Sequence, residues 1–148
     1  MEENLGILVE QLFSKDHNAG YQALQTLLAV SAESDAAYAY FDRFAGMLRG
    51  GNSYIRSRGM FLVAANARWD EENKTERALD DCLALIHDEK PITTRQCVKT
   101  LPQIAQSKPE LCGRILEALR NADPSIYADT MRPLIIKDIA AAIREIEG

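Results

Sequence analysis

Two stretches of the sequence, 43–69 and 90–109, contain basic side chains and no acidic ones. They hold nine of the 17 Lys and Arg residues, whereas all 22 Asp and Glu residues lie elsewhere in the chain. The nine bases are Arg43, Arg49, Arg56, Arg58, Arg68, Lys90, Arg95, Lys99 and Lys108. Guanidinium and ammonium groups bind carboxylates and phosphates through charge-assisted hydrogen bonds, and a cluster of them attracts an anionic partner. The sequence therefore predicts one mildly basic region on an otherwise acidic molecule.

The side chains expected first to contact this partner are those that lie farthest from the apolar stripe of their own helix, namely Arg58, Arg68, Lys99 and Gln103. For Trp69, which ends its helix beside a turn, two alternatives stay open: burial with the other aromatic residues of 38–69, or a role as an aromatic anchor for the partner. Arg56 and Arg95 flank the apolar stripe, so two alternatives stay open for them, packing at the edge of the core or contact with the partner. The candidate binding residues are Arg56, Arg58, Arg68, Trp69, Arg95, Lys99, Gln103 and Arg132.

Other reactive residue types do not have the spacing that catalysis or metal binding requires. Cys82, Cys97 and Cys112 are 15 residues apart, which is too far for the closely paired cysteines of a zinc site. We expect them to be small buried hydrophobic residues. His17 and His87 stand alone in predicted turns and suggest no nucleophile–base pair. The sequence predicts no catalytic residue, no metal and no cofactor, while a site assembled only by folding stays open.

Length and composition predict a single soluble domain. The chain has 148 residues, of which 47% are hydrophobic and 26% are charged, as in ordinary globular proteins. No apolar run approaches the roughly 18 residues that a membrane span needs. The acidic, amphipathic beginning is unlike a secretory signal, and together with three cysteines it predicts a cytoplasmic location. The net charge of -5 argues against a general binder of nucleic acid or anionic membranes.

Apolar residues recur at helical spacing from end to end, and no stretch alternates as a strand would. The sequence therefore predicts an all-α fold of about eight helices. Asp123 before Pro124 is expected to begin the last helix, and Asn73 with Glu76 to form a capping box. Pro102 and Pro133 fall inside apolar stripes, so we expect kinks there. The eight stripes lie in 5–13, 21–28, 37–48, 53–69, 79–86, 98–105, 112–119 and 135–146.

Every second predicted helix shares a pattern near its start. In the clearest example, Asn52 opens the helix, Arg56 follows, small Gly59 stands three positions later and Val63 seven positions later. Equivalent registers fall at residues 20, 56, 95 and 127, which are 36, 39 and 32 residues apart. A repeat of this length indicates stacked helix pairs, each of which buries its apolar face against its neighbours.

This pattern resembles the HEAT/armadillo class of helical repeats. The resemblance implies one domain, 1–148, built as a right-handed α-α superhelix of four antiparallel helix pairs, with approximate repeats 2–34, 35–70, 73–107 and 109–148. The departures are Gly20 and Tyr127 where the class often has Arg, and Pro102 where it has an aliphatic residue. The chain is also similar to small stand-alone bacterial HEAT-like proteins of unassigned activity. In this class the second helices line a concave face.

These observations favour a non-catalytic interaction module or scaffold. Its mildly basic concave groove would bind an anionic or amphipathic segment of a partner protein. The alternative is a binder of the nucleic-acid phosphate backbone, of the HEAT-like DNA glycosylase type. A third possibility is self-association into a homo-oligomer through the open ends of the stack.

Overall fold

Eight α-helices and five short 3-10 helices account for the fold of residues 2–148, the part of the chain that the computed structural model describes, and this part contains no strand. The all-α prediction and the number of helices are confirmed, since each predicted stripe falls in one helix and the turn or 3-10 helix beside it. The α-helices are α1 (Glu2–Gln11), α2 (His17–Glu33), α3 (Phe41–Met47), α4 (Ser53–Asn66), α5 (Lys74–Ala84), α6 (Pro91–Ser107), α7 (Cys112–Arg120) and α8 (Arg132–Glu147). The 3-10 helices are Ala36–Tyr40, Ala67–Trp69, Leu85–His87, Pro109–Leu111 and Pro124–Ile126.

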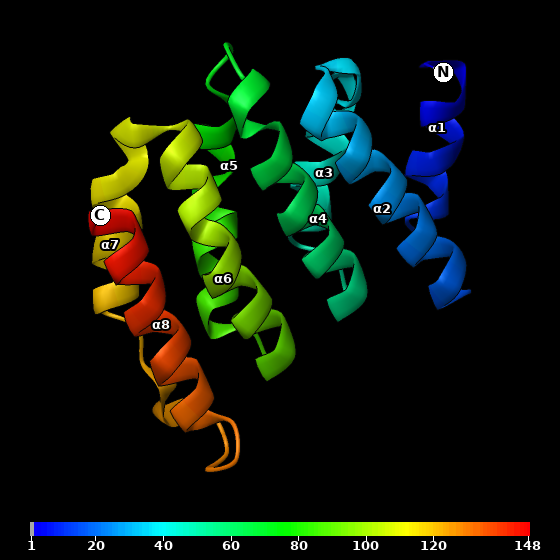
Figure 1. Cartoon of the computed structure of the whole chain (residues 1–148). Helices are drawn as coiled ribbons and strands as arrows, with labels where there is room; N and C mark the ends of the chain where they lie inside the picture. The colour runs from blue at the N-terminus through cyan, green and yellow to red at the C-terminus, as the bar shows by residue number, and fades with distance from the viewer. Residues whose placement is uncertain (1) are drawn as a thin grey trace.

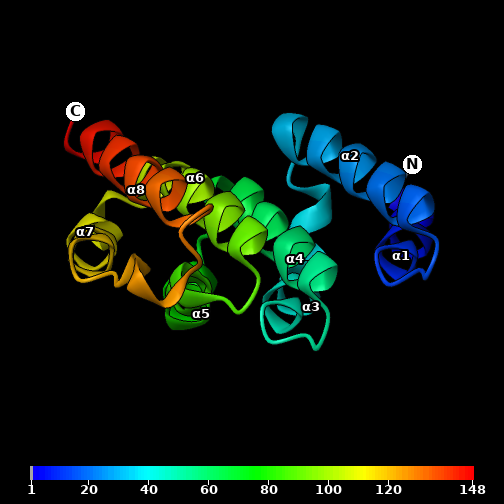
Figure 2. The same cartoon turned by 90° about the horizontal axis from the view of Figure 1, so that it is seen from below.

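The helices form two layers (Figures 1 and 2). One layer is the row α2, α4, α6 and α8, in which each helix contacts the next. The other layer contains α1, α3, α5 and α7, and the two termini lie at opposite ends of the molecule. Figure 2 shows that α2 and α8 both stand higher than α4 on the side away from the second layer. The first layer therefore curves around the exposed side of α4.

A continuous core between the layers explains this arrangement. Leu27 of α2, Leu62 of α4, Leu101 of α6 and Ile115 of α7 are all fully buried within one apolar cluster. Burying a side chain of this size stabilises the fold by about 1.5–3 kcal/mol. The helix α4 is buried on most of its sides, which is typical of a helix enclosed by others.

Gly59 allows α4 to lie directly on α3. A Cβ atom at this position would come within 2.7 Å of the Met47 Cβ and 2.8 Å of the Phe44 carbonyl oxygen. Phe44 and Met47 are themselves buried, so α3 has little room to move away. Only a residue without a side chain fits this contact.

The start of α8 differs from the prediction. Asp123 caps only the short 3-10 turn Pro124–Ile126, and α8 begins at Arg132. Tyr127 adopts an extended conformation here, and its hydroxyl donates to the Asp88 carbonyl at 2.6 Å. This buried contact interrupts the helix. The expected kink at Pro133 is therefore wrong, because Pro133 lies in the first turn of α8, where proline is tolerated. The helix α6 continues through Pro102 to Ser107.

Asp70, and not Asn73, caps the start of α5. Asn73 has a left-handed backbone and makes no capping bond, so the predicted capping box is wrong. The Asp70 carboxylate accepts hydrogen bonds from the Tyr38 hydroxyl at 2.6 Å and from the Thr75 N–H at 2.7 Å. Burial raises the pKa of Asp70, but bonds from Tyr38, Thr75 and the Glu72 N–H outweigh it and hold the pKa well below its usual range.

Replacing Gly59 tests the contact between α4 and α3. We expect Gly59→Ala to lower the free energy of unfolding by about 2 kcal/mol, since the added methyl group meets the α3 backbone. The matched control is Gly46→Ala, where a Cβ meets nothing within 4 Å. That change should raise stability by up to about 1 kcal/mol, because alanine favours helices. Urea denaturation measures both, and equal effects of the two variants would contradict the contact.

The Asp70 cap predicts a dependence of stability on pH. Because the folded-state pKa is lowered, Asp70 stabilises the fold above its unfolded pKa of about 4, and this stability is lost as the pH falls toward the folded-state pKa. At about pH 7, Asp70→Asn should cost roughly 2 kcal/mol, and the difference from the wild type should shrink below about pH 4. Urea denaturation over this pH range checks the prediction, and a difference independent of pH would refute it.

Candidate binding groove

A groove of about 850 Å³ lies over α4, between α2 and the N-terminal half of α6. Its lining residues come from three helices and include exposed apolar and aromatic side chains. Tyr21, Tyr54 and Ile92 remain 54%, 53% and 57% exposed. Among the described residues that line it, Arg58 and Lys90 are basic and none is acidic. The groove is lined by His17, Asn18, Tyr21, Leu24, Gln25, Leu28, Ser53, Tyr54, Ser57, Arg58, Phe61, Lys90, Pro91, Ile92, Thr93 and Gln96.

Helical spacing brings these side chains to one face. On α4, Tyr54, Arg58 and Phe61 are four and three residues apart, so they lie on one side of the helix. Ile92 and Gln96 do the same on α6. All five of these side chains line the groove, whereas Gly59 marks the side of α4 that contacts α3. Lys99 and Gln103 continue the same face of α6 beyond the groove, and both are exposed.

Arg58 is buried at the floor of this groove, with 5% of its surface exposed. Its Nη1 atom donates to the Leu12 carbonyl oxygen, just beyond α1, at 2.7 Å. Its guanidinium lies 5.7 Å from the centre of the Tyr54 ring. Burial lowers the pKa of Arg58. The expectation that Arg58 points away from the core is wrong, because α2 covers the side of α4 from which it projects.

Gly20 gives the Arg58 guanidinium its space. A Cβ atom at position 20 would lie 2.5 Å from Nη1 and 2.6 Å from the central guanidinium carbon. The sequence pattern identified Gly20 only as a departure from the repeat. The structure gives it a physical role, since a larger residue on α2 would displace Arg58 from the Leu12 carbonyl.

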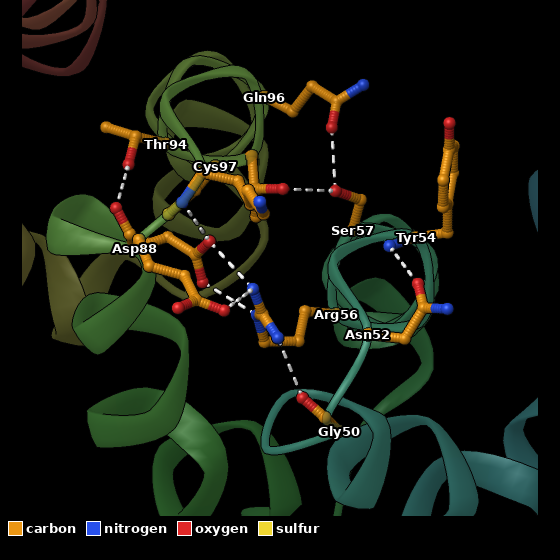
Figure 3. Close-up of polar contacts among 12 residues, drawn as sticks. Gly50, Asn52, Tyr54, Arg56, Ser57, Asp88, Thr94, Gln96 and Cys97 are labelled. Atoms are coloured by element: carbon orange, nitrogen blue, oxygen red, sulfur yellow. Dashed lines mark hydrogen bonds and ion pairs between the residues drawn. The ribbon is translucent and has the colours of Figure 1, made fainter.

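Arg56 and Arg95 are engaged in ion pairs within the chain. Arg56 donates to both carboxylate oxygens of Asp88, at 2.7 and 3.0 Å, and to the Gly50 carbonyl at 2.9 Å (Figure 3). Arg95 donates to Asp138 at 2.6 Å. Both arginines therefore make contacts within the chain, as expected for side chains that pack at the edge of the core.

The other candidate residues lie apart from the groove. Arg68 donates to the Ala32 carbonyl at 3.1 Å and lies 4.7 Å from the Trp69 ring centre. Trp69 donates from its indole N–H to the Ser31 carbonyl at 2.7 Å. Both residues therefore tie the end of α4 to the end of α2. Arg132, at the start of α8, pairs with Asp129 and donates to the Tyr127 carbonyl. The eight candidates do not form one site.

The two acid-free stretches of sequence are not free of acids in space. Arg43 pairs with Glu10 at 2.8 Å, and Arg49 lies 3.5 Å from Asp81. Arg56 and Arg95 have the pairs described above, and Lys99 lies 4.0 Å from Asp138. Five of the nine bases therefore lie within ion-pair distance of an acid. A continuous basic inner wall is therefore not present in residues 2–148, and Arg58 and Lys90 are the bases that line the groove.

Sequence reasoning missed most of the groove. Four residues that line the groove were not among the candidate binding residues: His17, Tyr21, Tyr54 and Ile92. His17 stacks on Tyr54, with ring centres 4.1 Å apart. Tyr21 and Tyr54 fall within the predicted stripes 21–28 and 53–69, which indicated burial for them, whereas His17 and Ile92 lie outside every stripe.

Cys82 and Cys97 are buried, as predicted, while Cys112 is only partly buried. Burial raises the pKa of the Cys82 thiol to about 12. Within residues 2–148, no cluster of His, Cys, Asp and Glu is arranged to hold a metal ion. None of the helices described here is both long and apolar enough to cross a membrane.

A comparison of the sequence with known protein families and with curated proteins finds no match.

The buried ion pair of Arg56 should matter far more to stability than an exposed pair. Arg56→Met leaves the buried Asp88 carboxylate without its partner, and we expect a loss of about 3–5 kcal/mol. Arg43→Met removes an exposed pair with Glu10 and should cost less than about 1 kcal/mol. Urea denaturation measures both losses. Similar losses for the two variants would contradict the structural role of Arg56.

Proposed function

We propose that this chain is a HEAT-like α-solenoid of four helix pairs that acts as a non-catalytic interaction module. Its groove over α4 would hold an amphipathic or anionic segment of a partner protein. The observation that carries the proposal is an open groove lined by exposed apolar side chains and two bases, with no acidic residue among the described residues that line it. Its volume falls in the range of about 300–1,000 Å³ that is typical of ligand sites.

Contacts between helix pairs support the repeat architecture. Polar contacts join residues about one helix pair apart in the sequence, with separations of 33 for Arg43–Glu10, 32 for Tyr38–Asp70 and 34 for Arg114–Asp80. The buried Arg56–Asp88 pair also spans 32 residues. A stack of similar units produces such recurring separations, because each unit contacts its neighbour in a similar way, while the Arg95–Asp138 pair spans 43 residues.

The chemistry of the groove suits binding better than catalysis. Ser57, which precedes Arg58 in the sequence, also lines the groove. Its hydroxyl donates to the Gln96 side-chain oxygen at 2.7 Å (Figure 3). The His17 ring packs against Tyr54. Among the described contacts, His17 makes no hydrogen bond to the Ser57 hydroxyl. Apolar side chains of a partner would gain about 25 cal/mol per Å² by covering Tyr21, Phe61 and Ile92.

A phosphate-backbone interface is the weaker proposal. Such binders neutralise several phosphates at once with free Lys and Arg side chains, whereas Arg43, Arg56 and Arg95 are held in ion pairs. Retention of duplex DNA at about 50 mM salt, lost steeply as salt rises, would favour this alternative over a protein partner.

The groove can be tested with a random peptide display library selected on the folded protein. We expect selected peptides to bind about tenfold more weakly after Tyr21→Ser or Ile92→Ser, which remove exposed apolar surface from the groove. The matched control is Ile136→Ser on α8, which is also half exposed but lies outside the groove. Fluorescence polarisation measures the affinities. Selection of no peptide, or equal losses in the control, would contradict the proposal.

A further inference from the structure

Resting on the proposed function, we propose that the groove selects a carboxylate: an Asp or Glu side chain of an otherwise apolar peptide segment binds to Arg58. The proposal identifies the chemistry of the partner segment and the residue that recognises it. It depends on the geometry around Arg58 and on the charge of the surrounding surface.

Arg58 is a buried cation without a carboxylate partner. Only 5% of its surface is exposed, and among the side chains of residues 4–148 no carboxylate forms an ion pair with it. Buried charged groups are normally paired, because removing an ion from water is costly. A neutral carbonyl, that of Leu12, is its partner instead.

Other buried or half-buried arginines of this chain differ from Arg58. Arg56 and Arg95, which also belong to the first layer, are each paired with an aspartate. Arg58 is two residues from Arg56 on the same helix and faces the groove. Of these three arginines, Arg58 is therefore the one that lines the groove and has no acidic partner among the described residues.

The guanidinium retains free donors on the groove side. A guanidinium has five N–H groups, and Nη1 uses one of them for the Leu12 carbonyl. In the described part of the chain, no hydrogen bond from Nε or Nη2 is found, and Arg58 lines the groove. Carboxylates bind such neighbouring N–H groups in pairs, with two parallel hydrogen bonds. A ligand carboxylate could therefore bind Arg58 without breaking the bond to Leu12.

The surrounding surface favours the same charge. Lys90 approaches the groove from the start of α6, opposite α2. The helices α2, α4 and α6 run parallel in Figure 1, so their N-terminal ends border the same end of the groove. These ends carry partial positive charge. Asp16, beside the groove, is engaged with the N–H groups of Asn18 and Ala19 at the start of α2.

The apolar lining determines what must flank the carboxylate. Tyr21 and Leu28 of α2 and Phe61 of α4 lie along the groove next to Arg58. A segment that places apolar side chains on these residues excludes water from the ion pair, which strengthens it. A purely acidic peptide leaves this surface exposed, and a purely apolar one leaves Arg58 unpaired.

The test uses peptides selected from the display library, synthesised with amidated C-termini in two forms. One form keeps its Asp or Glu, and the other has Asn or Gln there. On the wild type we expect the amide form to bind at least about tenfold more weakly. On Arg58→Met the two forms should bind alike, while Ile136→Ser should keep the full preference.

Because Arg58→Met also removes the bond to Leu12, a second readout uses the wild-type protein alone. In ¹⁵N-labelled protein, the Arg58 Nε–H signal should shift on addition of the acidic peptide and not with its amide form. Equal affinities of the two forms, with groove signals shifted, would overturn the carboxylate preference and leave the proposed function standing. If no selected peptide shifts groove signals, both fall.

Discussion

The contact between Gly59 and the backbone of α3 determines how deeply α4 lies between its neighbours. With no side chain at this position, α4 approaches α3 closely enough that a Cβ would meet the Phe44 carbonyl at 2.8 Å. The helices α2 and α6 then stand on either side of α4, and the first layer curves (Figure 2). The groove exists because α4 is enclosed on its other sides and open on this one.

The same enclosure explains the charges near α4. Two arginines, Arg56 and Arg58, leave this helix in nearly opposite directions, and both are buried. Arg56 extends toward the turn before α6, where Asp88 meets it with both oxygens. Arg58 extends under α2, where Gly20 makes room and a backbone carbonyl is the available acceptor. A buried arginine bound only to a carbonyl keeps the capacity to bind an anion, which is why the two residues differ in their proposed roles.

Local patterns in the sequence were enough to predict the helices but not to predict the residues of the groove. All eight helices could be predicted from the spacing of apolar residues, because this spacing reflects the helical repeat directly. The ion pairs of Arg43, Arg56 and Arg95 join residues 32 to 43 positions apart, and no local pattern predicts which acid meets which base. The helical wheel placed Arg58 away from the main stripe of α4 and so predicted that it would be exposed, because a wheel has no information on the cover supplied by α2. Asp70 and Tyr127 were missed for the same reason, since their partners come from distant segments.

A crystal structure of the protein with the tightest selected peptide would show whether the groove holds a carboxylate on Arg58. We expect the peptide to lie over α4 between α2 and α6. We also expect a carboxylate oxygen within about 3 Å of Nε or Nη2 of Arg58 and apolar side chains against Tyr21 and Phe61. A peptide bound on another surface, or one in the groove whose carboxylates all face water while Arg58 contacts only the Leu12 carbonyl, would contradict the proposal.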